Sequence, residues 1–176
     1  MHNLVKLVQA NGKALLLPAH DISIIRELEP AERETHKSGA SAVWVMLNGV
    51  AQSAVVRERF GFILKKAGGA SAERVQLRGI GDTRISLPRS AFAHAIEGER
   101  EDMVDGEKVK TDVTIVNTTL RGGGGAVAFH AADTVADIFD LLSSEESDDQ
   151  DDEDAAEDEP VAAKPARPRG PVKAVG

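Results

Sequence analysis

Three arginines share one face of a predicted β-hairpin near the middle of the chain. Arg74 and Arg78 alternate along residues 73–78, and Arg84 begins the returning strand at 84–87. Because alternate residues of a strand point to the same side, the three guanidinium groups should form a stripe that can bind phosphate or an acidic protein. The predicted interaction surface adds two further arginines, two glycines and a tryptophan, and so consists of Arg74, Arg78, Arg84, Arg89, Arg121, Gly122, Gly123 and Trp44.

Two glycine-containing segments have the composition of phosphate-binding loops. Gly79-Ile80-Gly81 begins like a dinucleotide loop, but Arg84 stands at the third glycine position and the segment joins two strands. Phosphate binding of that kind needs a helix N-terminus directly after the loop, so we predict a simple turn. The run Gly122–Gly125 is predicted to be a hairpin tip, with an anion-binding backbone nest as the alternative.

Residues suited to catalysis or metal binding are sparse. The chain has no cysteine, and its five histidines never form a ligand pair: His2, His20, His36, His94 and His130. No nucleophile stands at a spacing that would fix a base beside it. We therefore predict a protein that is not an enzyme and that holds no cofactor and no metal. Trp44 alternates with Val43 and Val45, so it is either an exposed interface anchor or cover for the sheet.

The net charge of −8 is concentrated near the C-terminus. Residues 1–144 carry 17 basic and 18 acidic side chains, residues 145–159 carry 11 acids and no base, and residues 160–176 carry four bases. Segments of such composition bury too little apolar surface to fold, so we predict a disordered acidic tract followed by a disordered basic tail rich in Pro and Ala. The acidic tract can serve solubility, or it can compete with a polyanion for a basic surface.

An internal duplication organises the first 144 residues. At an offset of 70, Val5–Pro18 aligns with Val75–Pro88, and the same offset pairs Val43 with Val113 and Val45 with Ile115. After an insertion at Arg121–Gly125 the offset becomes 75, so that Phe60 matches Val135. Repeats of this kind predict similar structural units. We predict one β-rich unit at 1–70 and a second at 71–144.

Each unit should contain about five short antiparallel strands and a C-terminal helix, which gives an α+β fold that is mainly β. The first unit is predicted to have strands at 4–8, 14–17, 22–28, 43–47 and 50–56, a polar loop at 30–41 and a helix at 57–67. The second has strands near 73–78, 84–87, 92–97, 111–119 and 126–131. Its helix is expected to be capped by Asp133 and to bury Val135, Ile138, Phe139 and Leu142.

The outer faces of the two first hairpins differ in polarity. In the second unit this face is polar and is expected to be solvated: Arg74, Gln76, Arg78, Arg84 and Ser86. In the first unit it is mostly apolar: Leu4, Lys6, Val8, Ala14 and Leu16. A hairpin that is apolar on both faces needs cover on both. That cover is either the other unit or another chain, so we expect a compact pseudo-dimer or a homo-oligomer formed through the apolar first hairpin.

Four short motifs are spaced over roughly the first 60 residues of the first unit: Asn11-Gly12-Lys13, then Ile22 and Ile25, then Asn48-Gly49, and finally Val56-Arg57-Glu58. In these motifs the unit resembles a small flagellar family, the FlbD-type proteins. This chain departs from the family in its second copy, its longer central loop and its charged tail. Relatives of the family occur in bacterial and phage genomes, and the resemblance implies a small interaction or regulatory module of such origin, without known catalysis.

These patterns predict a binding or regulatory adaptor that acts through protein–protein contacts. One alternative is a nucleic-acid-binding protein whose acidic tail is autoinhibitory. Another is a binder of a small ligand or anion in the cleft between the units. The sequence has no run of 18 apolar residues, so we expect no membrane association and a cytoplasmic location.

Overall fold

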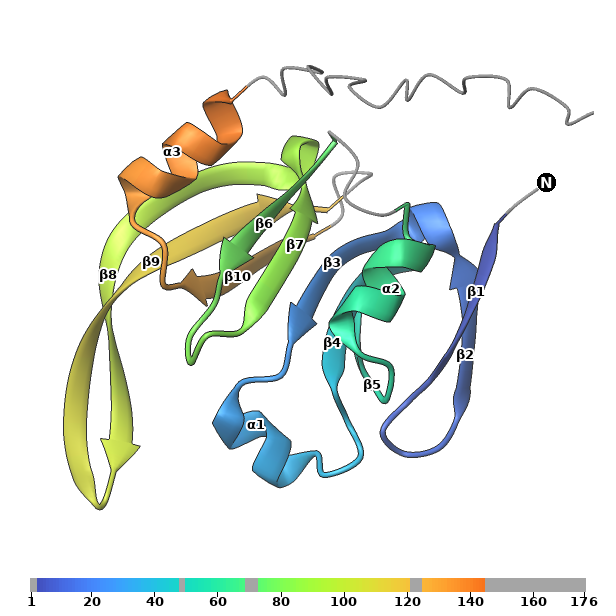
Figure 1. Cartoon of the computed structure of the whole chain (residues 1–176), viewed down its shortest axis with the longest axis horizontal. Coiled ribbons are helices and arrows are strands. Elements are labelled where there is room, and N and C mark those ends of the chain that lie inside the picture. Colours follow the sequence, from blue (N-terminus) through green and yellow to red (C-terminus); the bar gives the residue numbers. More distant parts are fainter. Residues whose placement is uncertain (1–2, 48–49, 69–72, 121–124, 145–176) are drawn as a thin grey trace, which may run out of the picture. The chain divides into compact units, whose positions relative to one another are not determined.

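Antiparallel strands dominate the structure, a computed structural model that describes residues 3–47, 50–68, 73–120 and 125–144 (Figure 1). These residues belong to one compact unit, Met1–Glu146. They form ten strands, three α-helices and two short 3₁₀ helices, which confirms the predicted mainly-β α+β class. The predicted acidic tract and basic tail, 145–159 and 160–176, lie outside the described residues. None of the described helices is long and apolar enough to cross a membrane.

The elements follow one another as short strands interrupted by small helices. The first half contains β1 (Leu4–Val8), β2 (Ala14–Pro18), η1 (Ala19–Asp21), β3 (Ile22–Glu27), α1 (Pro30–Thr35), β4 (Ser41–Leu47), β5 (Val50–Val56) and α2 (Phe60–Lys66). The second half contains β6 (Arg74–Arg78), β7 (Arg84–Pro88), η2 (Arg89–Ala91), β8 (Phe92–Val104), β9 (Glu107–Thr119), β10 (Ala126–Ala131) and α3 (Val135–Ser143).

The strands form three sheets, one of which contains strands from both halves. The orders are β5-β4-β3-β7-β6, β10-β9-β8 and β1-β2. Strands β3 and β7 join the halves through the residue pairs Ile25↔Ser86 and Arg26↔Ile85. Single bridges, Gln9↔Val56 and Gly79↔Ala131, connect the separate sheets to one another. When these single bridges are counted, the described strands follow one another in the order β2-β1-β5-β4-β3-β7-β6-β10-β9-β8.

Two apolar clusters lie on opposite faces of the central sheet. The first contains Ile25 of β3 and Val43 of β4, together with residues of β1, β2 and α2. The second contains Ile24, against which Trp44 packs, and it includes residues of β6, β7, β9, β10 and α3. Because neighbouring residues of a strand point to opposite faces, β3 contributes to both clusters. This explains why four consecutive residues of β3, Ile22–Ile25, are buried.

Three predictions about helical segments are wrong. Residues 30–35 form helix α1 within the predicted loop, because Pro30 stands at its first turn and Glu29 and Glu32 form a capping box. Helix α3 is capped by Thr134, whose hydroxyl oxygen accepts a hydrogen bond from the N–H of Asp137, so Asp133 is not the cap. Phe139 is 66% exposed rather than buried, although it lies beside the buried Ile138 on the same helix.

Candidate interaction surfaces

Arg74 contributes to the junction between the halves. Its guanidinium donates to the carbonyl oxygens of Ile22 (3.3 Å) and Ser23 (3.0 Å), and its Nε donates to Ser86 Oγ (3.0 Å). Burial lowers the pKa of Arg74 to about 10. Ser86 is fully buried where β7 pairs with β3. The expectation of a uniformly solvated hairpin face is therefore wrong at Arg74 and Ser86, because β3 covers that part of the face.

Arg78 and Arg84 are neighbours across the β6–β7 hairpin and remain largely exposed. Each is paired with a carboxylate: Arg78 Nε lies 2.6 Å from Asp133 Oδ1, and an Arg84 terminal nitrogen lies 2.7 Å from Glu27 Oε1. The Arg84 guanidinium also lies over the Phe60 ring, 4.7 Å from its centroid. These contacts occupy much of the positive charge that the sequence suggested for a phosphate or an acidic partner.

Arg89 and Trp44 have other neighbours than this pair. Arg89 donates to the carbonyl oxygens of Leu141 and Leu142, each at 2.9 Å, near the end of α3. Trp44 is partly buried against the second cluster, and the Arg26 guanidinium lies 5.6 Å from its ring centroid. Trp44 therefore covers the sheet. Arg121, Gly122 and Gly123 lie outside the described residues.

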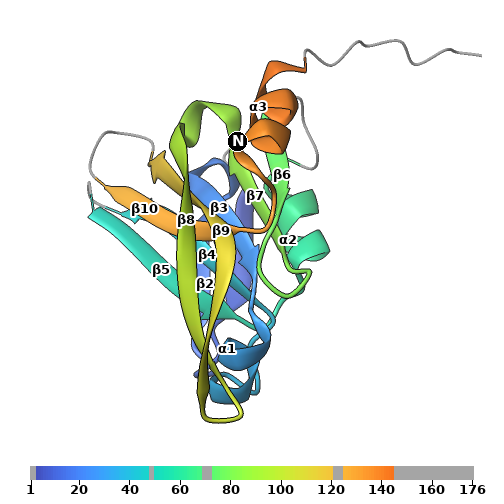
Figure 2. The ribbon, with the colours of Figure 1, turned by 90° about the vertical axis from the view of Figure 1, so that its left-hand side faces the viewer.

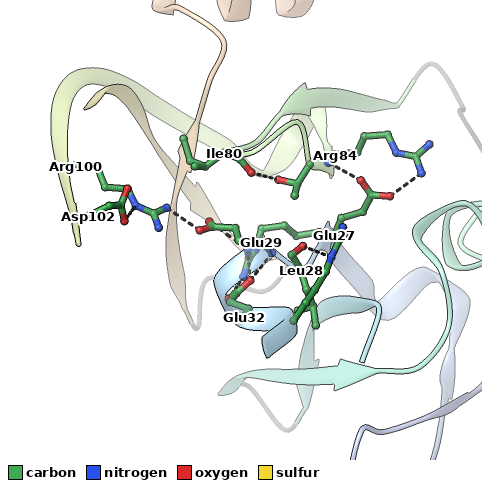
Figure 3. A network of polar contacts seen from close by, with 11 residues as sticks. Glu27, Leu28, Glu29, Glu32, Ile80, Arg84, Arg100 and Asp102 are labelled. Atoms are coloured by element: carbon green, nitrogen blue, oxygen red, sulfur yellow. Dashed lines mark hydrogen bonds and ion pairs between the residues drawn. The ribbon is translucent and has the colours of Figure 1, made fainter. Parts of the chain in front are cut away.

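An ion-pair network connects α1 with the second half of the chain (Figure 3). Arg26 at the end of β3 lies 2.6 Å from Glu32 and 3.4 Å from Glu29. Arg100 of β8 lies 2.8 Å from the other oxygen of Glu29 and 2.9 Å from Asp102. Both arginine side chains are at most one-fifth exposed. The shared Glu29 carboxylate therefore ties strand β8 to the first half.

The carboxylates of Glu27 and Glu32 have pKa values below the ordinary 4.5. Burial alone would raise both pKa values, but hydrogen bonds and attraction from arginine outweigh it. For Glu27 the donors are the side chain and the backbone N–H of Arg84, and for Glu32 the side-chain donor is Arg26. A carboxyl whose pKa is lowered on folding stabilises the folded state at a pH above its unfolded pKa.

We expect the free energy of unfolding to fall as the pH is lowered from 4.5 through the depressed pKa values of Glu27 and Glu32. Glu27→Gln should cost about 1 kcal/mol at pH 7 and weaken this acid dependence, because it removes the charge opposite Arg84. Urea unfolding at a series of pH values measures both effects. Glu34→Gln, on the exposed surface of α1, is the control, and an equal effect of the two substitutions would contradict the assignment.

The long β8–β9 hairpin extends beyond its sheet. Strand β10 pairs only with Thr114–Thr119 of β9, whereas no third strand among the described residues lies beside the pairs from Gly98↔Val113 to Val104↔Glu107. We call this two-stranded extension, residues 98–113, the arm (Figures 1 and 2). Its turn is Asp105-Gly106, with φ values of 51° and 84°. Large apolar side chains are exposed along it: Met103, Val104 and Val109.

Strands β2 and β8 stand at the two ends of the strand order. Among the described strands, β2 pairs only with β1 and β8 only with β9, so each has one unpaired edge. Large apolar residues are exposed beside these edges: Leu4 (54%) and Leu16 (63%) on the first hairpin, and Ile96 (50%) on β8. An edge with exposed apolar side chains is a ready site for another strand.

An open hollow of about 390 Å³ lies within the second half of the chain, on β8, β9 and the segment before α3. Its lining includes three carboxylates, Glu97, Asp112 and Asp133, and contains no basic residue. This lining disfavours an anion, and the hollow does not lie between the halves. Within the described residues no cluster of His, Asp and Glu is suited to a metal ion.

The arm is a surface that the sequence did not predict. The predicted strands end at residue 97 and begin again at residue 111, so residues 98–110 belong to no predicted strand. The signal was present in Asp105-Gly106, because Asp-Gly favours two-residue hairpin turns. The polar residues around it conceal the alternation that otherwise marks a strand.

Comparison of the chain with protein-family models, with curated proteins and with solved structures finds no match. The similarity to the FlbD-type family therefore stays a prediction.

Proposed function

We propose that this chain is a non-enzymatic protein-binding module, built from two copies of one β-rich unit, whose arm contacts a protein partner. The observation that carries the proposal is the exposed apolar surface of the arm. The duplication is the finer part of the proposal, and three sets of contacts support it.

The first three strands of the two halves begin at a constant spacing of 70 residues. Strands β1, β2 and β3 begin at residues 4, 14 and 22, and β6, β7 and β8 begin at 74, 84 and 92. Both β3 and β8 have an irregularity in register at their start, between Ile22 and Ile24 and between Phe92 and His94. The same local backbone feature at the same offset supports a common ancestry of the halves.

Tertiary hydrogen bonds correspond as well. The N–H of Val8 donates to the Glu58 carboxylate (2.9 Å), and the N–H of Arg78 donates to the Asp133 carboxylate (2.6 Å). These acceptors precede α2 and α3, and each fixes the start of its helix to the first strand of its own half. An acidic residue has thus kept one structural role in both halves.

The strand register changes the predicted alignment of the two halves near Val43. Ile25 pairs with Val43 in the first half, and Ala95, at an offset of 70, pairs with Val116 in the second. The residue that corresponds to Val43 is therefore Val116, not Val113. The offset grows by three because the arm replaces the shorter connection that contains α1. Burial agrees, since Val43 and Val116 are both fully buried.

The arm is suited to binding because it gains stability when another surface covers it. A two-stranded ribbon is marginal in water without a third strand or an apolar surface beside it. The described contacts hold the arm at Arg100, through Glu29, whereas Met103 and Val104 near the tip are exposed. Met103 and Val104 are consecutive residues of β8 and so point to opposite sides of the ribbon. A protein partner that contacts both sides would remove apolar area from water and stabilise the ribbon.

Affinity capture with matched baits tests the proposal. The full chain is compared with a double variant of the arm, Met103→Ser with Val104→Ser, and with a control, Val50→Ser, at an exposed position of β5. We expect the arm variant to lose proteins that the wild type and the control retain. Equal capture by all three baits would contradict the proposal. Binding of DNA or RNA at low salt by a chain that lacks residues 145–176 would support the nucleic-acid alternative instead.

A further inference from the structure

We propose that copies of this chain associate head to tail, with β2 of one copy pairing with β8 of the next as β7 pairs with β3 inside the chain. This inference rests on the duplication in the proposed function and names a partner for the strand edges, which is a second copy of the same chain.

The internal junction shows which edges belong together. Each half offers two outer strands, β2 and β3 in the first half and β7 and β8 in the second. The junction uses β3 from the first half and β7 from the second. By correspondence, β8 is equivalent to β3 and β2 is equivalent to β7. The chain thus forms one such junction internally, between β3 and β7. The corresponding strands β8 and β2 remain unpaired at their outer edges.

The register of the open junction follows from the closed one. Ile25 pairs with Ser86, and Arg26 pairs with Ile85. The corresponding residues place Ala95 opposite Leu16 of the second copy, and Ile96 opposite Leu15. The shared irregularity at the start of β3 and β8 gives these two edges the same local backbone form.

Side chains at the open edges are more apolar than their counterparts in the closed junction. Ser86 is fully buried and Arg74 donates to the edge of β3, whereas the corresponding Leu16 and Leu4 lie exposed. Ile96 is exposed at the position that corresponds to Arg26. Pairing β2 with β8 would remove these side chains from water together, which favours association.

Charges on the two edges are complementary. Residues 4–18 of the first hairpin include Lys6 and Lys13 and no acidic residue. The opposite edge carries the exposed Glu97 on β8, which corresponds to Glu27. The residue that corresponds to its internal partner Arg84 is Ala14, and the neighbouring Lys13 supplies the positive charge there. Opposite charges on the two surfaces favour a contact between unlike edges over a contact between two identical ones.

The two edges lie far apart in one molecule. In Figure 1 the β1–β2 hairpin lies at the right of the described body and β8 at the left, and Figure 2 shows β8 at the front, facing the viewer. The β2 and β8 edges of one chain therefore cannot pair with each other. A junction between unlike surfaces closes into a ring or continues as a filament, depending on the rotation between copies.

Two edge variants test the inference by light scattering coupled to size-exclusion chromatography. Leu16→Glu places a charge at the β2 edge and leaves β8 intact, and Ile96→Glu does the reverse. We expect the full-length wild type to form assemblies whose mass rises with concentration or stops at a closed ring. Each variant alone should be a monomer, and an equimolar mixture should form a dimer that grows no further, because only one native junction can form.

Other outcomes would overturn the inference. A wild type that stays monomeric at every concentration contradicts it. So does assembly lost in Leu16→Glu but kept in Ile96→Glu, which would indicate contact between identical β2 edges. The arm variant Met103→Ser with Val104→Ser should assemble like the wild type. Its loss of captured partners tests the proposed function separately, so the two proposals can fail independently. Circular dichroism and thermal unfolding confirm that the exposed substitutions leave the fold intact.

Discussion

Ile24→Ala and Ile25→Ala should each lower the free energy of unfolding by about 2–5 kcal/mol, and both should shift the same single transition. The two residues are neighbours on β3 and are fully buried, but Ile24 faces the second cluster and Ile25 faces the first. Because β3 lies in both clusters, a cavity on either side weakens the sheet that the two share. The halves should therefore unfold together.

Urea unfolding followed by two probes measures this cooperativity. Fluorescence reports on Trp44, the single tryptophan, and far-ultraviolet circular dichroism reports on all strands. Coincident transitions are expected for the wild type and for both variants. Two separated transitions, each moved by only one of the substitutions, would show instead that residues 1–70 and 71–144 unfold as independent domains.

Phe60→Ala should cost about 3–5 kcal/mol, the range for removing a fully buried aromatic side chain. Phe60 begins α2 and is 1% exposed in the first cluster, and its ring also supports the Arg84 guanidinium. Its loss removes packing within the first half and a contact to the second. The denaturant midpoint and the slope of unfolding measure the effect.

Phe62→Ala is the matched control, because the same change is made two residues later on the same helix. Phe62 is about half exposed, so its removal should cost less than about 1 kcal/mol. If the two substitutions were equally destabilising, the assigned orientation of α2 would be wrong.

The sequence predicted those elements whose signals are local. The hairpin β1–β2 followed from short apolar strands around Asn11-Gly12, and Gly12 indeed has a positive φ of 86°. The predicted helix at 57–67 contains Phe60 and Ile63 at a spacing of three residues, which places them on one face, and both are buried. In such elements the apolar periodicity and the turn residue lie within one short segment. A single window of sequence therefore contains all the residues that determine the helix or hairpin.

The fate of the arginines could not be predicted in this way. Arg74, Arg78 and Arg84 find their partners at Ser23, Asp133 and Glu27, more than 50 residues away along the chain. Only the tertiary arrangement brings these groups together: β3 lies beside β7 and supplies Ser23 and Glu27, whereas Asp133 comes from the segment between β10 and α3. The sequence therefore predicted correctly which residues share this face of the hairpin. It did not predict which residues cover the face.

The exposed Phe139 marks another limit of periodicity. The apolar stripe of α3 predicted that Phe139 is buried with Ile138, but only the latter contacts the second cluster. An amphipathic pattern gives the face that prefers to be covered, and it does not say how wide the covering surface is.

The double burial of β3 restricts how the two halves can change over generations. A substitution at Ile24 disturbs the second cluster and a substitution at Ile25 disturbs the first, so both sides of β3 are constrained by packing, whereas β8 has one solvent-exposed side. Mutations should therefore accumulate more freely on β8 than on β3, although both descend from one ancestral strand under the proposed duplication. The two copies should then differ in sequence because of where each lies in the fused molecule. The inner strand β3 should change little, and the outer strand β8 should change more.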